Sequence, residues 1–95
     1  MKIIKLSEMA QRAIGEGHQT SDDTILRQAI IAEQDAINLY EQFARSTSNK
    51  KLKRVLLDIS REEQVHVGEF EGLLKEIDKE YAKAVEEGKE EAKEI

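Results

Sequence analysis

The chain has 95 residues, a net charge of −5 at pH 7 and no cysteine, proline or tryptophan. Its acidic balance excludes the basic surface that binds nucleic acid or an anionic membrane, and the lack of cysteine excludes disulfides and thiolate metal sites. A chain of this length forms one small domain with a thin core, and no run approaches the roughly 20 apolar residues of a membrane span, so we expect a soluble, cytoplasmic protein.

Residues 1–20 are expected to form an N-terminal arm. Apolar residues recur there at helical spacing between Leu6 and Ile14, which predicts a short helix. The glycines Gly15 and Gly17 then end the pattern.

A long helix is predicted over residues 21–46. Thr20 or Ser21, followed by Asp22 and Asp23, is typical of a helix N-terminus. The apolar residues that follow share one broad stripe: Ile25, Leu26, Ala29, Ala32, Ala36, Ile37, Leu39, Tyr40, Phe43 and Ala44. The polar run Ser46–Asn49 interrupts this stripe.

A second long helix is predicted over residues 49–77. Its stripe consists of Leu52, Val55, Leu56, Ile59, Val67, Phe70, Leu73, Leu74 and Ile77. A short polar connector between two such helices indicates an antiparallel helical hairpin. Residues 78–95, rich in Glu, Lys and Ala, predict a weakly apolar C-terminal helix for packing or docking. The expected fold is therefore all-α.

Three polar residues lie on the two apolar stripes. Glu63 and His66 form a Glu-x-x-His step one helical turn apart, and Glu33 falls near the centre of the other stripe. An unpaired buried carboxylate costs several kcal/mol, so such a position favours a metal ion, a partner or a proton. Small residues leave room around Glu33: Ala29, Ala32 and Ala36.

In an antiparallel hairpin, Glu33, Glu63 and His66 are expected to converge, because they lie about equally far from the connector. An oxygen-rich set with one imidazole suits iron or manganese better than structural zinc. Ferritin-like di-iron proteins use a Glu from each of two helices and a Glu-x-x-His from each of the other two. This chain holds half of that pattern, so we expect a homodimer that completes a four-helix bundle around two metals.

Two segments, Leu26–Gln42 (LRQAIIAEQDAINLYEQ) and Arg61–Phe70 (REEQVHVGEF), resemble the encapsulated ferritin family, and the likeness covers roughly residues 22–77. The resemblance implies a single ferritin-like domain over residues 1–95 with a di-iron ferroxidase centre between two subunits. It also implies a decameric ring of dimers and the encapsulin shell protein as a partner. The enzyme would oxidise Fe(II) to Fe(III) and feed iron storage inside an encapsulin nanocompartment.

The metal ligands implied by this resemblance are Glu33, Glu63 and His66. Asp35 matches an acidic position that the family uses for secondary metal binding, and Tyr40 matches the tyrosine beside the metals. Leu39 stands where some members carry tryptophan, and Glu91–Ile95 lacks the Gly-Leu/Ile-rich peptide that docks such cargo to its shell. We interpret Tyr40 as a packed residue that hydrogen-bonds to a ligand rather than as a radical relay.

Two other functions stay open. One is a rubrerythrin-like di-metal peroxide reductase, which would need a separate electron donor because the chain has no cysteine-based electron-transfer site. The other is a non-catalytic oligomeric helical module with a structural metal. Without a metal, Glu63 and His66 would instead form a buried pair with Arg or Tyr across a dimer seam, and Asp35 would be a solvated charge.

Overall fold

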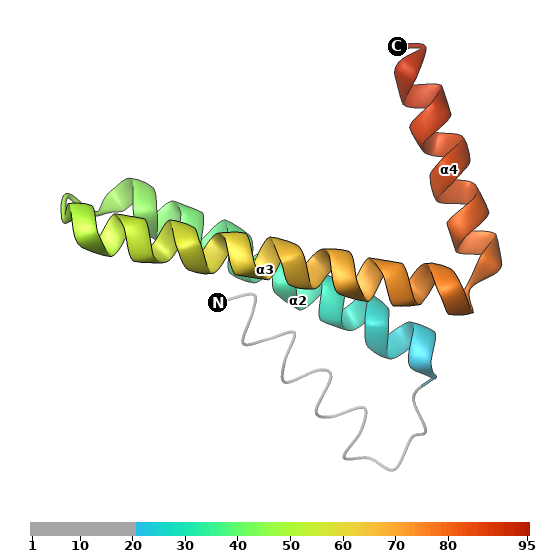
Figure 1. The fold of residues 1–95 in the computed structure, drawn as a ribbon, viewed down its shortest axis with the longest axis horizontal. Helices are drawn as coiled ribbons and strands as arrows, with labels where there is room; N and C mark the ends of the chain where they lie inside the picture. Colours follow the sequence, from blue (N-terminus) through green and yellow to red (C-terminus); the bar gives the residue numbers. More distant parts are fainter. Residues whose placement is uncertain (1–20) are drawn as a thin grey trace.

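The computed structural model describes residues 21–95, which form three helices (Figure 1). They are α2 (Asp22–Ser46), α3 (Lys50–Ile77) and α4 (Lys79–Lys93). Helices α2 and α3 lie side by side and antiparallel, whereas α4 points away from the C-terminal end of α3 at a steep angle. The all-helical fold and the antiparallel hairpin predicted from the sequence are thus confirmed, and the predicted helix between Leu6 and Ile14 lies outside the described residues.

Each helix begins one residue later than predicted, because Ser21, Asn49 and Asp78 are N-caps with extended backbone, and α4 ends at Lys93, two residues before the predicted end. The side chain of Asn49 accepts a hydrogen bond from the backbone N–H of Leu52 at 3.0 Å, and that of Asp78 accepts one from the backbone N–H of Tyr81 at 3.0 Å. Ser21 makes no such side-chain cap. Each polar cap satisfies a backbone donor that the first helical turn leaves free.

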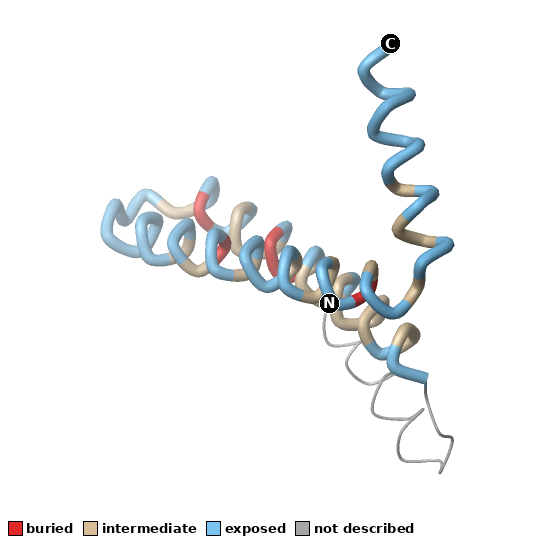
Figure 2. The backbone as a smooth tube through the Cα atoms, turned by 45° about the vertical axis from the view of Figure 1, so that its right-hand side comes forward, coloured by how far each residue is buried: buried red, intermediate tan, exposed pale blue. Residues whose placement is uncertain are grey.

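The packed core is a narrow seam between α2 and α3. Its buried apolar residues are Ala36, Ile37, Ala44 and Leu74. The seam also buries Ser60, whose hydroxyl donates to Glu41 Oε2 at 3.2 Å. Figure 2 shows these buried positions on the hairpin and none on α4. The seam therefore holds the hairpin, and α4 adds nothing to the core.

Several large residues of the predicted stripes are about half exposed: Ile25, Phe43, Leu52, Val55, Leu73 and Ile77. This agrees with the thin core expected from the sequence, because a two-helix hairpin has one seam and its apolar stripes are wider than that seam. Within residues 21–95, these side chains therefore stay partly uncovered. Within residues 21–95, each helix is too short or too polar to serve as a membrane-spanning segment.

Candidate metal centre

Glu33 lies near the middle of α2, and Glu63 and His66 lie near the middle of α3. The antiparallel packing brings them together, so that one potential ligand atom from each residue lies within 4.8 Å of the others. His66 Nδ1 is 3.4 Å from Glu33 Oε2 and 3.9 Å from Glu63 Oε2. The structure thus places the three residues in one cluster, as their equal distance from the connector predicts.

The two carboxylates are mostly covered, whereas the imidazole is open on one side. The exposed fractions of the side chains are 22% for Glu33, 20% for Glu63 and 47% for His66. Glu33 Oε2 is buried and accepts no hydrogen bond from any group in residues 21–95. A buried acceptor without a hydrogen bond costs about 1–3 kcal/mol, and this cost can be offset by the His66 imidazole 3.4 Å away, by a proton on Glu63 or by a metal cation.

The carboxylate of Glu33 beside Glu63, together with burial, raises the pKa of Glu63 to about 7, against an ordinary value near 4.5. The nearby His66 acts in the opposite direction and offsets only part of this rise. Two adjacent carboxylates resist carrying two negative charges, so near neutral pH they tend to hold a proton. A divalent cation neutralises the same pair and replaces that proton.

The donor set fits a divalent transition metal. Two carboxylates and one imidazole are ligands that iron and manganese accept, and three donors from one chain leave coordination positions free for ligands from elsewhere. A metal ion would bind between the Glu33 oxygen, which accepts no hydrogen bond from residues 21–95, and the exposed edge of His66. The additional ligands from outside the chain would bind the metal on this exposed side. Glu33, Glu63 and His66 could therefore hold a metal, but one chain supplies only part of its coordination sphere.

The structure places Asp35 and Tyr40 outside this cluster. Asp35 follows Glu33 by two residues and so lies about 200° round the helix, where it is partly buried. Tyr40 lies on the same side of α2 as Glu33, about 10 Å further along. None of the side-chain hydrogen bonds within residues 21–95 involves the Tyr40 hydroxyl, so the predicted bond from Tyr40 to a ligand is not made inside this part of the chain.

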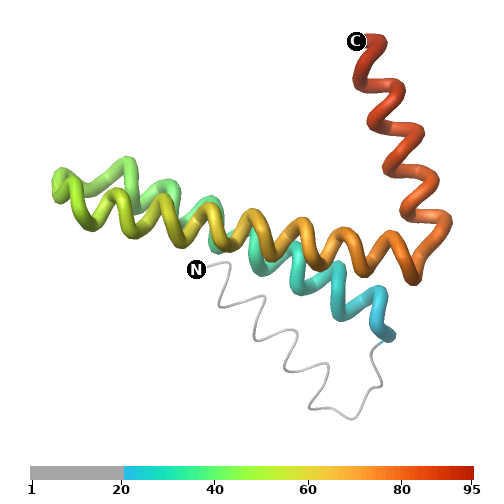
Figure 3. Tube along the Cα trace, viewed as in Figure 1, coloured from blue at the N-terminus to red at the C-terminus, as the bar shows by residue number. Residues whose placement is uncertain are grey.

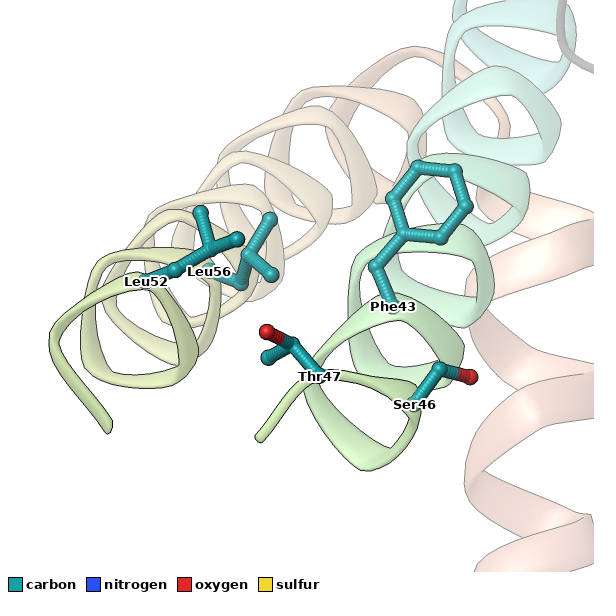
Figure 4. Close-up of a pocket in the computed structure, with 5 residues that line it drawn as sticks. All are labelled: Phe43, Ser46, Thr47, Leu52 and Leu56. Carbon is teal, nitrogen blue, oxygen red and sulfur yellow. The ribbon is translucent and has the colours of Figure 1, made fainter. Parts of the chain in front are cut away.

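A hollow of about 320 Å³ opens at the connector end of the hairpin. Its lining, drawn in Figure 4, consists of Phe43, Ser46, Thr47, Leu52 and Leu56. No acidic or basic side chain is among these residues, and Leu56 lies about 10 Å along α3 from Glu63. The hollow is therefore a gap in the apolar surface and not a second polar site.

Comparison with known proteins adds three findings. The family model described as Rubrerythrin matches residues 24–95. The chain is 54% identical over 71 residues to the ferritin-like-encapsulin shell fusion protein of Pyrococcus furiosus, a match that covers 75% of this chain. It spans only 21% of that fusion protein. The crystal structure of the encapsulated ferritin domain from Pyrococcus furiosus is similar with a TM-score of 0.77 and 48% identity, covering 81% of this chain and 82% of the other.

Proposed function

The chain belongs to the rubrerythrin family, among the encapsulated ferritins, and on this premise we propose that it oxidises Fe(II) to Fe(III) at a di-iron centre formed between two subunits. The observation that carries the proposal is the cluster of Glu33, Glu63 and His66, in which a buried Glu33 oxygen accepts no hydrogen bond from residues 21–95. These are the three residues that the Glu and Glu-x-x-His pattern of di-iron proteins requires from half of a bundle.

The charge balance between the carboxylate ligands and the metal ions supports a dimer that binds two ions. One chain offers two carboxylates, Glu33 and Glu63, which balance one divalent cation. Two chains offer four carboxylates and two imidazoles, which balance two ferrous ions and supply the ligand set of a ferritin-like di-iron site. A two-fold axis through the cluster would bring the two sets together.

The uncovered apolar surface supports the same pairing. On α3, Val55, Leu73 and Ile77 lie within about 40° of His66 round the helix axis. On α2, Ile25 and Phe43 lie about 80° from Glu33, rotated round the helix axis against the direction of the chain. Because α2 and α3 are antiparallel, this rotation brings Ile25 and Phe43 to the side of the hairpin on which His66 lies. We call this surface the His66 face, and covering it with a second copy would bury the half-exposed residues.

Within this site each residue has a distinct role. The bound iron would supply the electrons that pass to dioxygen or peroxide. Glu33 and Glu63 bind the cations and give up the proton that they hold between them near pH 7. His66, exposed on the His66 face, adds a nitrogen ligand. Fixed ligands on two packed helices keep the metals in place while their charge rises.

We assign two further roles on the strength of the resemblance. Asp35, on a different side of α2 from Glu33, would bind iron on its way to or from the centre. Tyr40, on the same side as Glu33, would pack beside the metals once a second chain covers it. A hydrogen bond from its hydroxyl to a ligand would then have to form in the assembled dimer.

The encapsulin shell protein is the proposed partner of the assembled oligomer. The similar Pyrococcus furiosus protein is, by name, a fusion of a ferritin-like part with an encapsulin shell. We propose by analogy that dimers of this chain form a decameric ring inside a cytoplasmic encapsulin nanocompartment. The ferric product would feed the iron store of that compartment.

The match to the Rubrerythrin model favours a second candidate, a di-metal peroxide reductase. The 95 residues contain no cysteine, so the electrons for repeated peroxide reduction would come from a donor outside them. A non-catalytic helical module with a structural metal is the third possibility. All three share the metal cluster and differ in what happens after the metal binds.

Anaerobic titration with ferrous salt, followed by air, separates these functions. A ferroxidase develops ferric absorbance rapidly when air is admitted. A peroxide reductase shows little reaction with air but turns over hydrogen peroxide when a reductant is supplied. A structural site binds ferrous ion and leaves it reduced.

The ligand assignment is tested by Glu63→Ala and His66→Ala in the same assay. Each should abolish rapid iron oxidation while circular dichroism shows that the helices persist. Glu69→Ala is the matched control, because Glu69 is an exposed acid on the same helix outside the cluster. Full activity in either ligand variant, or equal loss in the control, would refute the assignment.

A further inference from the structure

We propose that Arg27, Glu71, Asp78 and Tyr81 form a clasp that sets the direction of α4 and anchors it on the side of the hairpin opposite the His66 face. The four residues come from α2, α3 and the start of α4, so one small cluster joins all three helices. The clasp is independent of the metal cluster and of the proposed reaction.

Tyr81, in the first turn of α4, is held from two sides. Its hydroxyl donates to Glu71 Oε1 on α3 at 2.6 Å. The guanidinium of Arg27 on α2 lies over its ring, 5.2 Å from the ring centre. A hydrogen bond to a carboxylate and a cation over an aromatic face both depend on orientation. Together they fix the position of the ring relative to both helices of the hairpin.

Asp78, the single residue between α3 and α4, links the same groups. One carboxylate oxygen caps α4 by accepting the backbone N–H of Tyr81. The other oxygen accepts a hydrogen bond from the Arg27 guanidinium and forms an ion pair with it. The junction therefore cannot turn freely without breaking either the helix cap or the contact with α2.

Little else in residues 21–95 holds α4. The helix buries none of its residues, and it meets the hairpin only at its first turns (Figure 3). Its other ion pairs, Lys89 with Glu86 and Lys93 with Glu90, lie within α4 itself. Because no apolar core holds α4, the polar contacts of the clasp determine its direction.

The clasp and the metal cluster face opposite sides of the hairpin. Arg27 lies about 120° round α2 from Glu33, and Glu71 lies about 140° round α3 from His66. Both rotations lead to the face away from His66, where Tyr81 touches the two residues. Anchoring α4 there leaves the His66 face free for a second chain.

The protonation state of Tyr81 suits this role. Its hydrogen bond to Glu71 and its partial burial raise the pKa of Tyr81 above its ordinary value. The hydroxyl therefore keeps its proton at neutral pH and stays a donor to Glu71. The ion pair between Arg27 and Asp78 and the hydrogen bond from Tyr81 to Glu71 can therefore be present together.

Distance measurements between two spin labels test the clasp. The chain has no cysteine, so Ser48→Cys in the connector and Glu91→Cys in α4 give two unique labelling positions, both exposed. Labelled chains are diluted with unlabelled protein so that only distances within one chain are measured. The parent protein should give one narrow distance peak, and Arg27→Gln or Glu71→Ala should lose it to a broad distribution.

Two further variants separate the clasp from general damage. Glu71→Gln keeps an acceptor for the Tyr81 hydroxyl and should restore the narrow peak that Glu71→Ala loses. Lys89→Gln breaks an ion pair within α4 and should leave the peak unchanged. Circular dichroism checks that each variant stays helical. A broad distribution in the parent, or a narrow unchanged peak in both Arg27→Gln and Glu71→Ala, would overturn the proposal.

Discussion

At the scale of single residues, the main feature of the candidate metal centre is a pair of carboxylates that lie close together on the apolar stripes of two helices. Glu63 and Glu33 are each about four-fifths covered, and their proximity raises the pKa of Glu63 to about 7. Both positions were predicted from the helical periodicity, because a charged residue on an apolar stripe is unusual. The exposure of His66 was not predictable, since it depends on which part of the stripe forms the seam.

This arrangement predicts that Glu63 makes the metal-free protein less stable as the pH rises. The pKa of Glu63 in the folded chain lies above its ordinary value of about 4.5, so the folded state favours the protonated form. That stabilisation is complete below about pH 4.5 and is lost as the pH passes through 7. Glu63→Gln stays neutral, so its melting temperature relative to the parent should rise between pH 5 and pH 8.

Thermal unfolding followed by circular dichroism in the presence of a chelator measures this difference. Glu69→Gln, an exposed substitution on the same helix, is the control and should show no such trend. A melting-temperature difference between Glu63→Gln and the parent that is equal at pH 5 and pH 8 would argue against the coupled carboxylate pair.

At the scale of the helices, the seam between α2 and α3 carries most of the stability of the hairpin. Apolar periodicity predicted both helices and the hairpin correctly, because two amphipathic helices with a short connector have few other ways to pack. It could not predict the direction of α4. That direction depends on Arg27 meeting Asp78 and Tyr81, which are far from it in sequence and polar.

Leu74, which is 1% exposed, should be the most sensitive position in the seam. Leu74→Ala leaves a cavity and should lower the free energy of unfolding by about 2–5 kcal/mol. Leu57→Ala removes the same atoms from a residue that is 45% exposed and should cost far less. Urea unfolding at one fixed protein concentration compares the two, and similar losses would contradict the assigned seam.

The side chain of Asn49 caps the N-terminus of α3 and is expected to stabilise this helix. Asn49→Ala removes the side-chain acceptor for the backbone N–H of Leu52 and should cost about 1 kcal/mol in the free energy of unfolding. Ser21→Ala at the start of α2 should cost less, because Ser21 makes no side-chain cap. Denaturant unfolding of both variants tests the difference, and a larger loss at Ser21 would show that the caps are assigned wrongly.

At the scale of the whole molecule, one chain is incomplete in two ways. Its His66 face leaves large apolar residues half exposed, and the metal cluster found within residues 21–95 offers three donors. Sequence reasoning anticipated both shortfalls from the thin core and the half pattern of ligands. The size of the proposed assembly depends on contacts between chains, which the periodicity of one chain does not specify.

The His66 face should therefore control assembly. Leu73→Lys places a charge on this face and should convert the proposed dimer or larger oligomer to monomers and weaken iron binding. Val65→Lys is the matched control, because Val65 is 54% exposed and lies about 100° round α3 from His66. Sedimentation velocity reports the mass of each variant, and dissociation by Val65→Lys alone would place the dimer interface on another face.

In the proposed dimer, two chains pool Glu33, Glu63 and His66 around two iron ions. Crystals grown with ferrous salt, with diffraction data collected at the iron absorption edge, test it most directly. We expect two anomalous peaks beside a two-fold axis, each within coordination distance of these residues from both chains. A single peak bound by one chain alone, or iron bound elsewhere while these side chains face solvent, would contradict it.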